Sequence, residues 1–151
     1  MRFRTSFDLV VRAPYAQAAP LFGPEGERAW AGKNWDPEFI YPLPAHDEQG
    51  AVFTVCHGPF RAVWVNTVFD VEARHIQYAY FLPEIMVTVI DVRFQPEAAA
   101  TWVHVVYTRT ALTAAGNQHV AAMSEADKSA GREWEQSIAA YLASRKAGTR
   151  H

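Results

Sequence analysis

Residues 124–146 read SEADKSAGREWEQSIAAYLASRK, and the periodicity of the chain changes there. Apolar side chains recur at steps of three and four, which places them on one face of an amphipathic helix: Ala130, Trp134, Ile138, Tyr141 and Leu142. Residues 124–127 resemble a capping box, although residues 120–123 could extend the helix backwards. We expect residues 147–151 to fray. A long helix at the end of the chain must pack against whatever precedes it.

The chain before this helix alternates in the manner of β-strands. Residues 3–11 place Phe3, Thr5, Phe7, Leu9 and Val11 on the face that we expect to be buried. Further strands are predicted at 51–56, 60–71, 76–82, 85–94 and 101–112. Tight turns at His57-Gly58-Pro59 and Pro83-Glu84 separate some of them, and Ala115-Gly116-Asn117 ends the last strand. Short turns between consecutive strands favour an antiparallel meander.

Two short helices are predicted between the first strand and the meander. Ala13-Pro14 starts the first of them, in which Pro20 is expected to cause a kink or an early end. Gly23-Pro24 separates it from the second, which is predicted over residues 25–30. Residues 32–50 are rich in proline and predict a packed loop with a short strand.

This order of elements resembles the helix-grip fold of the superfamily that contains START lipid-transfer domains, the birch-pollen allergen family and polyketide cyclases. The local matches are Ala13-Pro14, the segment 23–30 (GPEGERAW), Asn34-Trp35-Asp36-Pro37 and the terminal helix stripe. The segment 23–30 looks most like bacterial members of unassigned role. The resemblance implies an α+β domain over residues 1–151, with a curved antiparallel sheet of about seven strands around the long helix. It also implies a cavity between sheet and helix that binds a small hydrophobic molecule, with catalysis in a minority of families.

The composition excludes several classes of protein. The chain has 151 residues, half of them hydrophobic, and a net charge of -2. Disordered chains are poorer in apolar residues, and nucleic-acid binders usually carry a basic excess, so neither class is expected. Aromatic residues make up 13% of the chain, which points to a hollow or aromatic-walled interior.

Other features bear on compartment, metals and partners. There is a single cysteine, and neither a signal-peptide core nor an apolar run long enough for a membrane span, so we expect a cytoplasmic protein without stable membrane insertion. No two of the six histidines have a metal-ligand spacing, and no metal or cofactor is predicted. Cys56 and His57 are adjacent on a strand and therefore point to opposite faces, which argues against a catalytic dyad. A homodimer is a possible assembly.

The predicted cavity walls come from both ends of the chain and from the strands between them. Tyr78 and Tyr80 share a strand face and could orient a ligand through their hydroxyl groups or pack as ordinary core. Trp30 and Trp35 could gate the cavity or close that end of it, and Trp134 could fill the space under the helix. The residues expected to contact a ligand are Phe7, Leu9, Phe22, Trp30, Trp35, Tyr78, Tyr80, Ile90, His104, Trp134, Ile138 and Tyr141.

His104 is the candidate catalytic residue, because a histidine facing the cavity could serve as an acid or base. The two faces of the strand 101–112 are equally apolar, so alternation leaves open whether His104 faces the cavity or solvent. Asp91 and Arg93 are expected on the solvent face of their strand. In the rival arrangement they form a buried catalytic pair, which Arg109 could join.

Three functions therefore remain. The leading hypothesis is a non-enzymatic protein that binds a small hydrophobic molecule, such as a lipid, steroid or polyketide. The second is an enzyme of the cyclase or dehydratase type, whose cavity acid or base removes a proton next to a carbonyl group. The third is a protein-interaction module, which predicts a closed interior and an exposed apolar patch.

Overall fold

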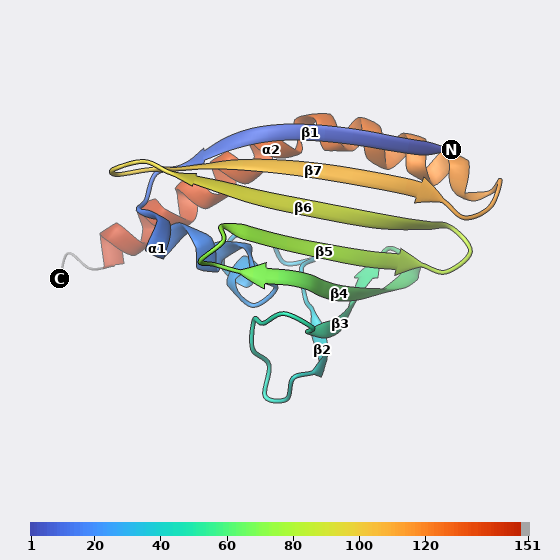
Figure 1. The fold of residues 1–151 in the computed structure, drawn as a ribbon, viewed down its shortest axis with the longest axis horizontal. Coiled ribbons are helices and arrows are strands. Elements are labelled where there is room, and N and C mark those ends of the chain that lie inside the picture. Colours follow the sequence, from blue (N-terminus) through green and yellow to red (C-terminus); the bar gives the residue numbers. More distant parts are fainter. Residues whose placement is uncertain (149–151) are drawn as a thin grey trace.

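The fold is built on a seven-stranded antiparallel sheet, seen in a computed structural model that describes residues 1–148. The order of the strands is β1-β7-β6-β5-β4-β3-β2, so the meander runs from β2 to β7 and β1 pairs with its last strand (Figure 1). The strands are β1 (Arg2–Val11), β2 (Glu38–Tyr41), β3 (Val52–His57), β4 (Phe60–Asp70), β5 (His75–Leu82), β6 (Met86–Pro96) and β7 (Thr101–Ala111). The predicted meander is confirmed, with each strand within a few residues of its expected bounds.

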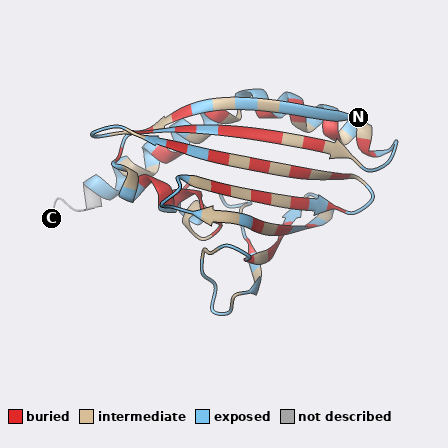
Figure 2. Cartoon of the chain, in the orientation of Figure 1, coloured by how far each residue is buried: buried red, intermediate tan, exposed pale blue. Residues whose placement is uncertain are grey.

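Burial alternates along the strands, as Figure 2 shows for β5, β6 and β7. The expected inner face of β6 is confirmed, with Met86, Thr88, Ile90, Val92 and Phe94 all buried. On β7 the odd-numbered residues from Thr101 to Arg109 are buried, whereas Trp102 and His104 are exposed. The structure therefore settles the orientation that alternation alone left open, and it turns Arg109 toward the interior.

The long helix α2 (Gly116–Gly148) packs mainly against β1 and β7 and lies along one face of the sheet (Figure 1). It begins earlier than expected, because Gly116 belongs to the helix and not to the preceding turn. A Cβ at Gly116 would lie 1.9 Å from the carbonyl oxygen of Ile85, so a glycine is needed at this start. The predicted fraying of residues 147–151 falls largely outside the described residues, and the α2 backbone continues to Gly148.

Three short helical segments follow β1: α1 (Tyr15–Ala18), η1 (Ala19–Phe22) and η2 (Gly26–Ala29). Pro20 lies at the start of η1, where the α-helix tightens into a 3-10 helix as its ring and missing N–H require. The Asp47 carboxylate accepts hydrogen bonds from the backbone N–H groups of Glu25 (2.9 Å) and Gly26 (3.1 Å). A Cβ at Gly26 would lie 1.7 Å from the Pro20 carbonyl oxygen, so η2 lies directly against η1. These contacts determine where Glu27 and Trp30 lie.

The loop between β2 and β3 extends away from the sheet at the β2 edge (Figure 1). Its base exposes Ile40, Tyr41 and Leu43 to solvent. Within residues 1–148, none of the helices has the length and apolar character needed to cross a bilayer.

Candidate ligand cavity

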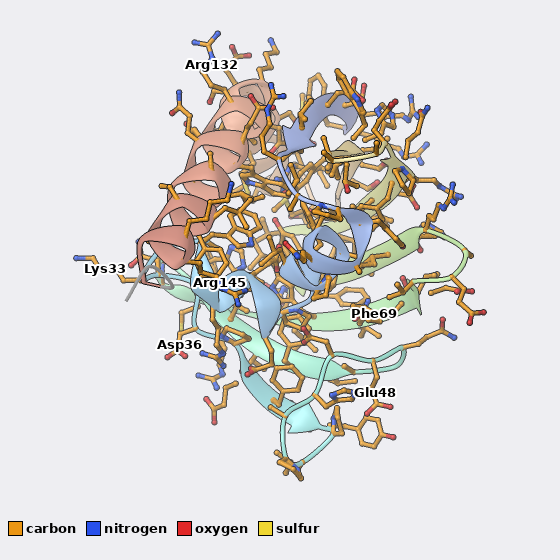
Figure 3. All side chains as sticks on the ribbon, turned by 90° about the vertical axis from the view of Figure 1, so that its left-hand side faces the viewer. Lys33, Asp36, Glu48, Phe69, Arg132 and Arg145 are labelled. Carbon is orange, nitrogen blue, oxygen red and sulfur yellow. The ribbon has the colours of Figure 1, made fainter. Side chains whose placement is uncertain are left out.

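A cavity of about 350 Å³ lies between the sheet, η2 and α2. The helix α2 packs on the part of the sheet formed by β1 and β7. Strands β3, β4 and β5 are not covered by α2, and their side chains line the cavity together with residues of the segment between β1 and β2. Side chains fill much of the remaining space between helix and sheet, while Arg132 projects outward from α2 (Figure 3). The lining residues are Phe22, Glu27, Trp30, Ala31, Trp35, His57, Trp64, Tyr78, Tyr80, Ile90, Val92, Tyr107, Arg109, Met123, Glu133, Trp134 and Ser137.

Stacked aromatic rings form the wall on the β3–β5 side. The rings of Trp64 and Tyr80 stack with centroids 4.3 Å apart, and the His57 ring stacks on Tyr80 at 5.1 Å. On the opposite side Trp30 meets Trp134 edge to face at 5.5 Å. Rings held against one another in this way form a preformed apolar surface, because they have little freedom left to lose when a ligand binds.

One end of the cavity is formed by a buried ion pair between the sheet and α2. Arg109 donates two hydrogen bonds of 2.8 Å to the Asp127 carboxylate, from Nε and Nη2. Its Nη1 donates to the Tyr80 hydroxyl (2.6 Å) and to Thr88 Oγ1 (3.1 Å). The side chains of Arg109 and Asp127 are only 4% and 7% exposed. The guanidinium charge is therefore compensated within the protein, and Arg109 positions the Tyr80 hydroxyl.

His57 is held as a neutral imidazole in the aromatic wall. Trp64 Nε1 donates to His57 Nε2 (3.3 Å), which must therefore carry a lone pair, and the proton lies on Nδ1. Burial lowers the pKa of His57 below its usual value, and the positive charge of Arg109 lowers it further. The ring thus contributes a polar but uncharged edge to the cavity.

Glu27 is a carboxyl group in the cavity without a hydrogen-bond partner. The residue is half-buried, and burial followed by the negative charge of Asp47 raises the pKa of its carboxyl well above the usual range. Burial raises the pKa of Tyr78, and the negative charge of Glu27 raises it further. Burial also raises the pKa of Tyr107, where Arg109 acts in the opposite direction and Glu27 makes a smaller contribution than Tyr80 and Asp127. Tyr78 donates its hydroxyl to the Phe22 carbonyl. Within residues 1–148, no hydrogen bond engages the Glu27 carboxyl or the Tyr107 hydroxyl.

The structure brings most of the predicted ligand residues to this cavity. Seven of them line it: Phe22, Trp30, Trp35, Tyr78, Tyr80, Ile90 and Trp134. Leu9 and Ile138 are instead fully buried core residues, and Tyr141 lies on α2 beyond the lining. Phe7 lies behind the wall and meets the Trp134 ring edge to face at 5.2 Å. These four residues therefore do not line the cavity, and their predicted contact with a ligand stays a prediction.

His104 is not a cavity residue. It lies on the outer face of β7, its side chain is 47% exposed, and its Nδ1 is 2.8 Å from the Asp8 carboxylate. A catalytic role in the cavity is therefore contradicted by its position. Asp91 and Arg93 lie on the same outer face, where Asp91 also pairs with His75, as expected of a solvent-side pair. Arg109 does not join them, because it points to the opposite face of the sheet.

The charged lining was missed by the sequence analysis. Asp127 precedes Trp134 by two helical turns and so lies on the same buried face of α2. A carboxylate on an apolar helix face needs a buried cationic partner, and that signal points to Arg109. Glu27 gave a weaker signal, because an acidic residue in the first turn of a short helix is ordinary on a solvated surface. Among residues 1–148, no three His, Cys, Asp or Glu side chains gather as metal ligands would.

Comparison with known proteins identifies the fold. No family model and no curated protein matches the sequence. Among solved structures, norcoclaurine synthase from Thalictrum flavum in complex with dopamine and hydroxybenzaldehyde is similar over 100% of this chain and 90% of its own, with a TM-score of 0.66 and 11% identity. The di-domain ARO/CYC BexL from the BE-7585A biosynthetic pathway is also similar, with a TM-score of 0.68 and 13% identity. The similar region spans 93% of this chain and 46% of the BexL chain. Ara h 8.0201 is similar over 95% of this chain and 99% of its own, with a TM-score of 0.61 and 12% identity.

These similarities confirm the expected fold. The chain has the helix-grip architecture of the Bet v 1-like proteins, with a curved antiparallel sheet around a long C-terminal helix and short helices after the first strand.

Proposed function

We propose that this protein binds a small, largely apolar aromatic molecule in the cavity between the sheet and α2. The observation that carries the proposal is the cavity itself, with about 350 Å³ of space inside stacked aromatic walls. A cavity of this size suits a molecule of one or two rings. Burial of apolar ligand surface stabilises such a complex by roughly 25 cal/mol per Å² before the cost of association is subtracted.

The solved structures of the same fold support this proposal without deciding it. One of them is a synthase in complex with dopamine and hydroxybenzaldehyde, which are small aromatic compounds. Another is an ARO/CYC protein of a biosynthetic pathway. With identities of 11% and 13%, they support a ligand of that size and character for this chain and no particular compound.

The neutral dye N-phenyl-1-naphthylamine tests the proposal. We expect saturable fluorescence enhancement with one site per chain. Ser137 lines the cavity and is exposed, so the large side chain of Ser137→Trp should occupy part of the cavity and weaken binding of the dye by about tenfold or more. Ala139→Trp is the matched control, because Ala139 is an exposed α2 residue outside the lining. Equal dissociation constants for the two variants, or no saturable binding, would contradict the proposal.

Proton transfer on the bound molecule is a second candidate function, which the unpartnered Glu27 carboxyl favours. A carboxyl with a raised pKa in an apolar cavity is suited to general acid–base chemistry. His104 cannot act as the acid or base in the cavity, because it lies on the outer face of the sheet. Glu27 is the candidate for that role.

Opening of 5-nitrobenzisoxazole tests this second function, because it needs one base to remove a ring proton as the N–O bond breaks. We expect turnover above that of free carboxylate, rising with pH as Glu27 ionises and lost in Glu27→Gln. Turnover that persists in Glu27→Gln would exclude Glu27 as the base.

The third hypothesis, an interaction module, predicted a closed interior. The open cavity argues against it, although Ile40, Tyr41 and Leu43 do form an exposed apolar group. A homodimer stays a prediction that a mass measurement in solution can check.

A further inference from the structure

The formal charges around the cavity are unbalanced. Arg109 brings a positive charge, but Asp127 compensates it through two hydrogen bonds. Glu27 and Glu133 bring carboxyl groups to the lining, and Asp47 lies close enough to Glu27 to raise its pKa. His57 is neutral. When Glu27 is ionised, the cavity therefore carries a net negative charge and repels anions.

The Glu27 carboxyl lines the same cavity as several aromatic rings. Tyr78 and Tyr107 interact with it electrostatically, and Trp30, Trp35 and Trp134 line the same cavity. Ring faces attract cations, and the attraction is stronger where water is excluded. A carboxylate beside several such rings is the arrangement that recognises an organic ammonium group.

Neutral hydrophobic molecules do not explain the position of Glu27. An apolar ligand would remove water from a carboxyl that has no protein hydrogen-bond donor, which costs free energy in either protonation state. A ligand cation removes that cost, because it supplies the missing counter-charge. The titratable groups that line the cavity with Glu27 are His57, Tyr78, Tyr80, Tyr107, Arg109 and Glu133, and Asp47 lies close to Glu27. The one cation among them, Arg109, is already paired with Asp127 through two hydrogen bonds.

We infer that the molecule bound in this cavity is an aromatic cation, with its positively charged nitrogen against the Glu27 carboxylate and its ring among the tryptophans. The inference rests on the proposed function, since it names the chemical class of the ligand of the same cavity. Binding is then coupled to loss of a proton, because the cation favours the ionised form of Glu27. Glu27 acts as the specificity-determining residue, and the aromatic walls supply most of the contact area.

A pair of compounds of the same shape tests the inference. Benzyltrimethylammonium carries a quaternary nitrogen, and neopentylbenzene has a carbon atom in its place. Both are measured by displacement of N-phenyl-1-naphthylamine from the wild-type chain, from Glu27→Gln and from Glu133→Gln. Glu133 is the matched control, because it also lines the cavity but is exposed on α2.

In the wild-type chain we expect the cation to bind about tenfold more tightly than its neutral counterpart, which corresponds to about 1.4 kcal/mol. Glu27→Gln should abolish this preference, because the affinity for the cation falls to that of neopentylbenzene. Displacement of the dye by neopentylbenzene in the same variant shows that the cavity is intact. Glu133→Gln should keep most of the preference. Calorimetry can measure the enthalpy of benzyltrimethylammonium binding in buffers of different ionisation enthalpy. In the wild-type chain this enthalpy should vary with the buffer, because a proton is released on binding, and in Glu27→Gln it should not.

Two results separate failure of this inference from failure of the proposed function. If the dye and neopentylbenzene bind and the cation binds no better, or if its advantage survives in Glu27→Gln, the inference is wrong and the binding function stands. If neither the dye nor either compound binds the wild-type chain, the proposed function is wrong and this inference with it.

Discussion

Replacement of Asp127 by alanine is expected to destabilise the folded protein by about 3–5 kcal/mol. The Arg109 guanidinium is 4% exposed and would keep its charge after its bidentate partner is removed. It would retain hydrogen bonds to Tyr80, Thr88 and the Met123 sulfur, and all three of these partners are neutral. A buried charge without a counter-charge is far more costly than the loss of the ion pair itself. Urea denaturation of the wild-type and variant chains measures the difference.

The same helix offers a matched control for this prediction. Glu125 forms an ion pair with Lys128 at 2.8 Å, but both side chains are largely exposed. Glu125→Ala should therefore change the free energy of unfolding by less than about 1 kcal/mol. The double variant Asp127→Leu with Arg109→Met should recover most of the loss, because no charge is then left buried. Equal effects of Asp127→Ala and Glu125→Ala would contradict the ion-pair argument.

The fold could be predicted because its signals are local and agree with one another. The alternation in 3–11, the short turns of the meander and the helical stripe through Trp134 each follow from periodicities of two or about 3.6 residues. The position of His104 could not be derived in the same way. Val103, Val105 and Tyr107 are no more apolar as a set than Trp102, Val106 and their neighbours, so alternation gives no preferred face.

The charged half of the site depends on contacts between distant parts of the chain. Glu27 reaches the cavity because η2 lies directly against Pro20 and because Asp47 binds the backbone at Glu25 and Gly26. No local pattern encodes either contact. The aromatic lining of the cavity was easier to predict. Large apolar side chains such as Phe22 and Tyr80 are usually buried, and the space between the sheet and α2 is the interior in which they pack.

Phe22 is the residue at which stability and ligand binding are expected to change together. It is 1% exposed, and its ring contacts those of Trp30 (5.9 Å), Phe94 (5.3 Å) and Trp134 (6.4 Å) while also lining the cavity. Phe22→Ala should reduce the free energy of unfolding by about 3–5 kcal/mol, because it removes buried apolar surface and leaves a void. Tyr78 binds the Phe22 backbone carbonyl, so this hydrogen bond can persist in the variant.

The void left by Phe22→Ala adjoins the cavity, so it should also change which molecules fit. We expect pyrene, which is larger than N-phenyl-1-naphthylamine, to gain affinity relative to that dye in the variant. Phe81→Ala is the control, because Phe81 lies on β5 but is 43% exposed and away from the cavity. It should change the free energy of unfolding by about 0.5 kcal/mol and leave the relative affinities unchanged. If Phe22→Ala destabilises the protein without a gain for pyrene, the surrounding rings have collapsed into the void, and the cavity is shaped by packing that adapts to the loss of one ring.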